Sequence, residues 1–162
     1  MNTGGLLFRH LNQERLVSLQ NDAGWEIGSH TVHHPDLTRI PEEYVEPELT
    51  LSKSRLETLL GKPVRSLAVP FGRYNVTTLN AAVRAGYSII CGCTVSEDRR
   101  SEIRIKLIDR KSVYLFDSLS NIRAKIYRTP YSGVETLKLR IINMCSYATS
   151  LLKPPKLDQY RS

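Results

Sequence analysis

The sequence predicts an α/β domain built on a parallel β-sheet. Between residues 11 and 116, stretches of strand character alternate with helical patterns, and the loops between them are short. A chain of 162 residues with 41% apolar and 24% charged residues is an ordinary single globular domain. Functional residues in such folds gather where strands end. Two unusual stretches, "SHTVHHP" and "VPFGRYN", each follow a predicted strand.

The first elements are predicted from apolar periodicity and from the residues that end them. Residues 11–24 read as a helix, and the strand "WEIGS" at residues 25–29 follows. Residues 42–60 form a second helix with its leucines on one side, and Gly61 ends it. Because proline disrupts a helix interior, Pro47 predicts that this helix begins or kinks there.

The middle of the chain continues the alternation. "VRSLAV" at residues 64–69 is a strand that runs into a loop marked by proline and glycine. Asn75 is placed to cap a third helix, which ends at Gly86. "YSIICGCTV" at residues 87–95 is then a buried strand of nearly continuous apolar character.

Beyond residue 100 the patterns predict two short strands and two helices. The strands are "IRIKLI" and "KSVYLF", and the helix "DSLSNIRAKIY" is capped by Asp117 or Ser118. A last helix at about residues 134–152 carries an apolar stripe, from Val134 to Leu152, that suits packing on the sheet or on a neighbour. Its basic residues leave a membrane-surface role open.

The net charge of +7 is uneven: residues 1–81 carry −1 and residues 82–162 carry +8. A basic half can meet a polyanion or an anionic membrane, but the charges are scattered and lack interleaved aromatics, which favours a solvated surface. No nucleic acid partner is expected. No apolar run approaches the roughly 20 residues that span a bilayer. No signal-peptide pattern is visible, which predicts a cytoplasmic protein.

The three cysteines are an odd number in no framework spacing. Cys91 and Cys93 fall on the same face of their predicted strand, where a metal or redox role is possible. We expect two small buried core residues instead, in a reducing compartment.

Three of the four histidines crowd into "HTVHH". His30 and His34 are four residues apart, so both can reach one divalent ion such as zinc. Pro35 argues against an uninterrupted helix and favours a bend after the strand. Spacing alone leaves metal binding open, because such pairs without a metal are common. Two ligands are also one fewer than a catalytic zinc site normally takes from the protein.

Three neighbours are expected around the pair rather than on the metal: Thr31, His33 and Asp36. His33 would point elsewhere. Asp36 could accept a hydrogen bond from a ligand imidazole, or it could serve as a turn residue after proline.

The order of these motifs resembles the polysaccharide deacetylases with a NodB-type homology domain. The resemblance rests on "GWEIGSHTVHHPDL", "SKSRLETLLGKPVRSLAVPFGRYN" and "AGYSIICGCT", and it covers about residues 11–116. It implies a distorted (β/α) barrel and metal-dependent removal of acetyl groups from sugar polymers. It also implies that His30 and His34 are metal ligands. The substrate groove would be lined by Pro70, Phe71, Gly72, Arg73 and Tyr74.

The chain departs from that family pattern at two points. The family's first motif, T-F-D-D, supplies a third metal ligand and the catalytic base. It should precede residue 1, and no Asp-Asp pair occurs in the chain. No histidine follows His34 to act as the acid. We therefore expect an N-terminally incomplete partial barrel over residues 1–130, followed by a helix and tail over residues 131–162.

Three consequences follow from an incomplete barrel. Metal binding should be weak, and catalysis should be impaired or absent, with no catalytic residue identifiable. The exposed edge of the "WEIGS" strand favours self-association. Two functions stay open: a carbohydrate deacetylase, or a degenerate domain that binds a glycan or a protein. The sugar, the linkage and the metal have no readable signature in the sequence.

Overall fold

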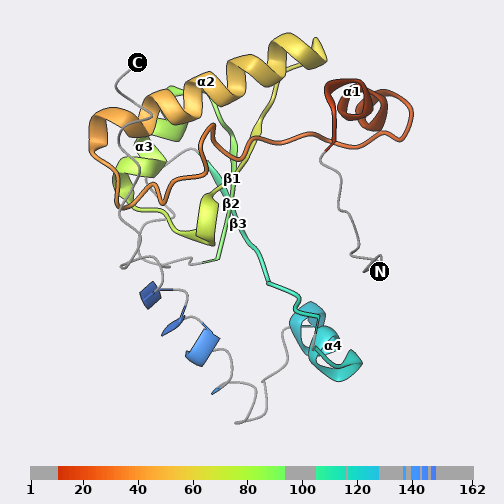
Figure 1. The fold of residues 1–162 in the computed structure, drawn as a ribbon, viewed down its shortest axis with the longest axis vertical. Helices are drawn as coiled ribbons and strands as arrows, with labels where there is room; N and C mark the ends of the chain where they lie inside the picture. The colour runs from red at the N-terminus through yellow and green to blue at the C-terminus, as the bar shows by residue number, and fades with distance from the viewer. Residues whose placement is uncertain are drawn as a thin grey trace, which may run out of the picture.

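The computed structural model describes residues 11–93, 105–115, 117–127, 137, 140–142, 144, 145, 147 and 148. Helices and strands alternate along it, as Figure 1 shows. The elements in chain order are α1 (Gln13–Asn21), α2 (Glu42–Leu60), β1 (Ser66–Ala68), the 3₁₀ turn η1 (Pro70–Gly72), α3 (Val76–Arg84), β2 (Ile89–Gly92), β3 (Lys106–Asp109) and α4 (Leu119–Tyr127).

The sheet is parallel and its strands lie in the order β1-β2-β3. Ile90 in β2 is in register with Leu67 on one side and with Leu107 on the other. Ser29 adds a single parallel bridge to Leu67 on the free side of β1. The chain therefore steps across the sheet in one direction, and the segments that follow Ser29, β1 and β2 leave from the same end.

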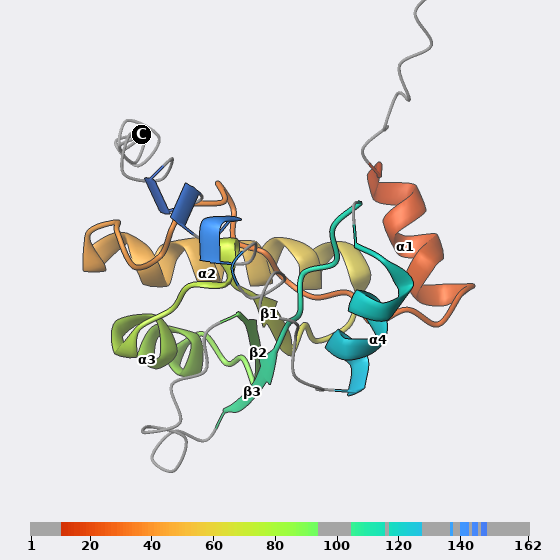
Figure 2. The ribbon, with the colours of Figure 1, turned by 90° about the horizontal axis from the view of Figure 1, so that it is seen from below.

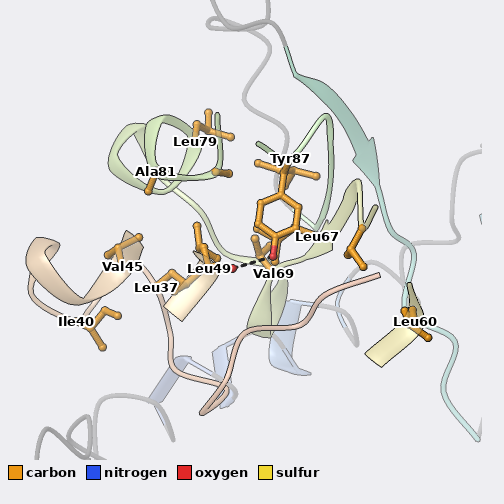
Figure 3. Close-up of a cluster of buried hydrophobic side chains, with 13 residues drawn as sticks. Leu37, Ile40, Val45, Leu49, Leu60, Leu67, Val69, Leu79, Ala81 and Tyr87 are labelled. Atoms are coloured by element: carbon orange, nitrogen blue, oxygen red, sulfur yellow. Dashed lines mark hydrogen bonds between the residues drawn. The ribbon is translucent and has the colours of Figure 1, made fainter. Parts of the chain in front are cut away.

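The core lies between the sheet and helices α2 and α3, which pack together beside it (Figures 1 and 2). In Figure 3, Tyr87, two residues before β2, reaches toward α2, and its hydroxyl donates to the carbonyl of Leu49 at 3.0 Å. Among the described residues, the fully buried apolar side chains include Leu37, Val45, Leu49, Val64, Leu67, Val69 and Ile90. Helices α1 and α4 lie away from α3 in Figure 2, and α1 buries no residue.

The helix ends agree with the residues that predicted them. Asn75 caps α3, where its Oδ1 accepts from the Thr78 N–H at 2.9 Å. Gly61 ends α2 in the left-handed conformation at φ 63°. Ser118 caps α4, since its Oγ accepts from the Asn121 N–H at 3.2 Å. The helix does not begin at Pro47, because α2 starts at Glu42 and continues past it.

Two predicted strands are wrong. "WEIGS" makes only the Ser29 bridge, and residues 24–28 form no ladder. Residues 111–115 of "KSVYLF" are irregular, because the described sheet ends at β3 and offers them no neighbour. A segment becomes a strand only if a neighbouring strand pairs with it, and its own apolar residues do not reveal whether such a neighbour exists. Self-association at this edge stays a prediction.

The last predicted helix is only partly described. The described residues from 137 to 148 are helical, but Leu137 and Ile141 are exposed. Cys145 and Ala148 of the same stripe are exposed as well, so packing on the sheet is wrong at these four positions. Packing on a neighbour stays a prediction. The rest of residues 134–152 lies outside the described part, as do residues 128–136, where the predicted domain boundary falls.

The cysteines are not the buried pair that strand periodicity predicted. Cys91 is half-buried in β2, and Cys93 is exposed just after it because β2 ends at Gly92. In the described part of the chain, Cys91, Cys93 and Cys145 form no disulfide. No described helix is both long enough and apolar enough to span a bilayer.

Candidate functional site

His30 directly follows Ser29, the last residue of its segment that pairs with the sheet. Ser29 donates its N–H to the Ser66 carbonyl and accepts from the Ala68 N–H, each at 2.9 Å. The Ser29 hydroxyl is buried against that of Ser52 on α2, at 2.7 Å. The Nδ1 of His30 donates to the Ala68 carbonyl at 2.6 Å. Because a carbonyl only accepts, Nδ1 carries a proton, and in the neutral imidazole Nε2 then has the lone pair that a ligand atom needs.

His34 is brought next to His30 by a bend in the backbone, as Pro35 predicted. Thr31 and His34 both lie in the left-handed region, at φ 69° and φ 58°. That conformation costs roughly 1–2 kcal/mol for a residue other than glycine. The Thr31 hydroxyl accepts from the His34 N–H at 3.1 Å. The two imidazole centroids end 4.7 Å apart with their planes at 77°.

Glu48, which the sequence did not point to, forms hydrogen bonds to the residues of this bend. Its side chain comes from α2 and is only 1% exposed. One carboxylate oxygen accepts from the Val32 N–H at 2.8 Å and from the His33 N–H at 3.0 Å. The other lies 2.5 Å from His33 Nδ1. His33 therefore turns toward α2 and away from the pair. The available signal was an acid on the apolar face of a helix, three residues after Val45 and four before Ser52.

The "PFG" loop lies beside the histidines. Phe71 is 49% exposed, and its ring centroid is 5.0 Å from that of His34 in an edge contact. The backbone of Phe71 is left-handed at φ 56°, and Gly72 follows at φ 69°. Gly72 is buried against Cys93, whose N–H donates to the Gly72 carbonyl at 2.9 Å. Tyr74 is half-buried and packs against the core, so the predicted groove residues do not all face solvent equally.

Asp36 is a turn residue rather than a partner of a ligand imidazole. Its Oδ1 accepts from the N–H and hydroxyl of Thr38, at 3.1 and 2.6 Å. Its Oδ2 accepts from Arg73 Nη1 at 2.9 Å, in a pair shielded from water. The guanidinium of Arg73 also lies 5.4 Å from the ring centroid of Tyr147. This ion pair ties the histidine segment to the "PFG" loop.

Among the described residues, the donor set fits a divalent transition metal but provides two ligands. His30 and His34 are exposed and neighbouring, and neutral imidazole is a common ligand for such ions. Within the described ranges, no third His, Cys, Asp or Glu joins them in a cluster that could hold an ion.

Comparison with known proteins gives the wider context of these residues. The family model described as polysaccharide deacetylase matches residues 6–90. YxkH of Bacillus subtilis (strain 168) is 30% identical over 80 residues, which are 49% of this chain and 28% of that protein. The peptidoglycan-N-acetylmuramic acid deacetylase PdaA of the same organism is 30% identical over 80 residues, or 30% of its length. The aligned segment thus spans less than a third of either relative.

A solved structure has the same fold. The Streptococcus pyogenes deacetylase PplD, in complex with acetate, superposes with a TM-score of 0.58 at 24% identity. The match covers 72% of this chain and 51% of that one. With the parallel sheet described above, it confirms the expected fold class: an α/β chain that carries part of a (β/α) barrel of the deacetylase type.

Proposed function

This chain belongs to the polysaccharide deacetylase family, and we propose that it is a carbohydrate deacetylase domain that removes N-acetyl groups with a divalent cation, zinc by preference. The observation that carries the proposal is the histidine pair. Two exposed imidazoles lie 4.7 Å apart, and His30 is fixed by the Ala68 carbonyl with Nε2 free. This tautomer and this exposure leave both rings accessible to a cation.

His30 and His34 are the residues that would hold the cation. When bound, such an ion supplies Lewis-acid polarisation of the acetyl carbonyl and lowers the pKa of the attacking water. The chain's own part is to orient the imidazoles. The Ala68 carbonyl fixes the His30 ring, and the Thr31 hydroxyl fixes the backbone of His34. Thr31, His33 and Asp36 thus act around the ligands and not on the ion.

The loop from Pro70 to Tyr74 is proposed to line the sugar groove. Phe71 offers an exposed ring beside His34. The Phe71 N–H lies in the first turn of a 3₁₀ helix, where a backbone donor has no preceding carbonyl within the helix. It can therefore donate to an oxyanion that develops on the acetyl carbon. Arg73 holds the loop against the histidine segment through Asp36.

Two ligands bind an ion more weakly than three, so we propose that this chain by itself has low deacetylase activity. General acid–base chemistry needs a titratable group within reach of the reacting atoms. Neither a base nor an acid is assigned here. A non-catalytic domain that binds a glycan through the same loop is the second candidate, favoured by the two-ligand donor set.

One experiment separates the two candidates. Cobalt(II) binding, read from its visible absorption, should be lost in His30→Ala and His34→Ala but kept in His10→Ala, a histidine outside the motif. Acetate release from N-acetylated oligosaccharides is measured on the same samples with added zinc. Metal-dependent release that both motif variants lose supports the enzyme. Oligosaccharide binding without release supports the second candidate. Cobalt binding that is equal in all variants refutes the metal site.

A further inference from the structure

We propose that Glu48 is a positioning residue for the histidine pair, holding the backbone between His30 and His34 in the bend that brings the two rings together. This inference rests on the proposed function, because the pair matters only if it binds a ligand. Glu48 bonds to Val32 and His33, the residues between the pair, so we expect its effect to pass through the loop.

The first argument is burial. A carboxylate that is 1% exposed is unfavourable unless hydrogen-bond donors satisfy it. Three donors to Glu48 are the N–H groups of Val32 and His33 and the imidazole of His33. All three belong to the segment between the proposed ligands. The side chain is thus buried toward this loop, and an apolar residue would serve the helix face equally well.

The second argument is the backbone conformation. Thr31 and His34 flank the two bonded N–H groups, and both are left-handed residues other than glycine. Residues held in this region persist when their surroundings over-determine them. The Glu48 carboxylate, which bonds to Val32 and His33 together, is the contact that fixes the peptide between the two strained positions.

The third argument is that the two ligands are anchored differently. His30 follows the bridge at Ser29 and has the Ala68 carbonyl on its own ring. The place of His34 depends on how the chain turns after Thr31. Loss of Glu48 should therefore displace His34 more than His30, and a two-ligand site that loses one ligand loses most of its affinity.

The test is a zinc titration in competition with a chromophoric chelator. Glu48→Leu keeps the helix face buried but gives the two N–H groups no acceptor, and we expect affinity 10–100-fold weaker, the range for residues that orient metal ligands. Glu48→Gln should stay within about 3-fold of the native chain, because its amide oxygen can still accept from both N–H groups. Glu43→Leu, on the exposed first turn of the same helix, is the matched control and should change nothing.

Circular dichroism establishes that each variant is folded, and Glu48→Ala replaces Glu48→Leu if the larger side chain prevents folding. Equal zinc affinity in folded Glu48→Leu and the native chain would overturn the inference. If the native chain binds no zinc, the proposed function fails, and amide hydrogen exchange then decides the role of Glu48. The Val32 and His33 amides should be protected in the native chain. If the Val32 and His33 amides exchange as fast as solvent-exposed loop amides in the native chain, the inference is overturned.

Discussion

Replacing Gly72 with alanine should destabilise the protein more than the same change at Gly61. Both glycines have left-handed backbones, at φ 69° and φ 63°, so both variants lose roughly 1–2 kcal/mol to backbone strain. At Gly61 a new Cβ meets no atom within 4 Å. At Gly72 it would lie 2.8 Å from the Cys93 N and closer still to the Cys93 side chain. Overpacking of this kind costs about 1–3 kcal/mol more.

The close contact between a new Cβ at residue 72 and Cys93 cannot be removed by a small local movement. The Cys93 N–H is hydrogen-bonded to the Gly72 carbonyl at 2.9 Å, so the two segments cannot separate without losing that bond. Urea unfolding followed by circular dichroism should therefore place Gly72→Ala about 2 kcal/mol below Gly61→Ala. For a chain of this size that equals a thermal midpoint roughly 4–8 °C lower. Equal losses in the two variants would refute the close approach of the "PFG" loop to the end of β2.

Two further predictions concern pH. The pKa of Glu57 lies below its ordinary value of 4.5, chiefly because Lys53 donates to its carboxylate and secondly because the Val64 N–H does. Its contribution to the free energy of unfolding is present above pH 4.5 and is lost as the pH falls through the lowered pKa. Glu57→Gln should therefore reduce the loss of stability at acid pH. The same acid loss in Glu57→Gln and the native chain would contradict this. Burial raises the pKa of Tyr87 above 10.0, so stability should fall as the pH rises through that raised value. Tyr87→Phe removes the hydrogen bond to Leu49 and should lower the free energy of unfolding by about 1 kcal/mol at neutral pH. The variant should also lack the fall in stability at alkaline pH. Urea unfolding at a series of pH values measures both effects.

Helix ends were predictable because the residues that make them act locally. The side chain of Asn75 bonds three residues ahead, and Gly61 adopts the left-handed backbone that ends a helix, whatever the rest of the chain does. Pro35 likewise predicted locally that no uninterrupted helix runs through the histidines, but the left-handed backbones of Thr31 and His34 that make the bend were not predicted. The fold class followed from the alternation of these local elements.

Contacts between distant segments were not predictable in this way. Glu48 was missed because its partners, Val32 and His33, lie on another element and bond through backbone N–H groups, which any residue has. The pairing of Asp36 with Arg73 joins residues 37 positions apart and was equally invisible. The predicted "WEIGS" strand is the reverse case, in which a predicted contact does not form. Its apolar residues suggested a ladder, but only Ser29 meets a neighbouring strand.

The most direct test of the metal site is anomalous diffraction from crystals soaked in zinc, recorded at the zinc edge. The histidine pair predicts a peak about 2.0–2.1 Å from Nε2 of His30 and from a ring nitrogen of His34, the usual zinc–imidazole distance. It also predicts that the His30 Nδ1 stays hydrogen-bonded to the Ala68 carbonyl. A zinc peak at other residues, with none between these two rings, would contradict the assignment of His30 and His34 as ligands.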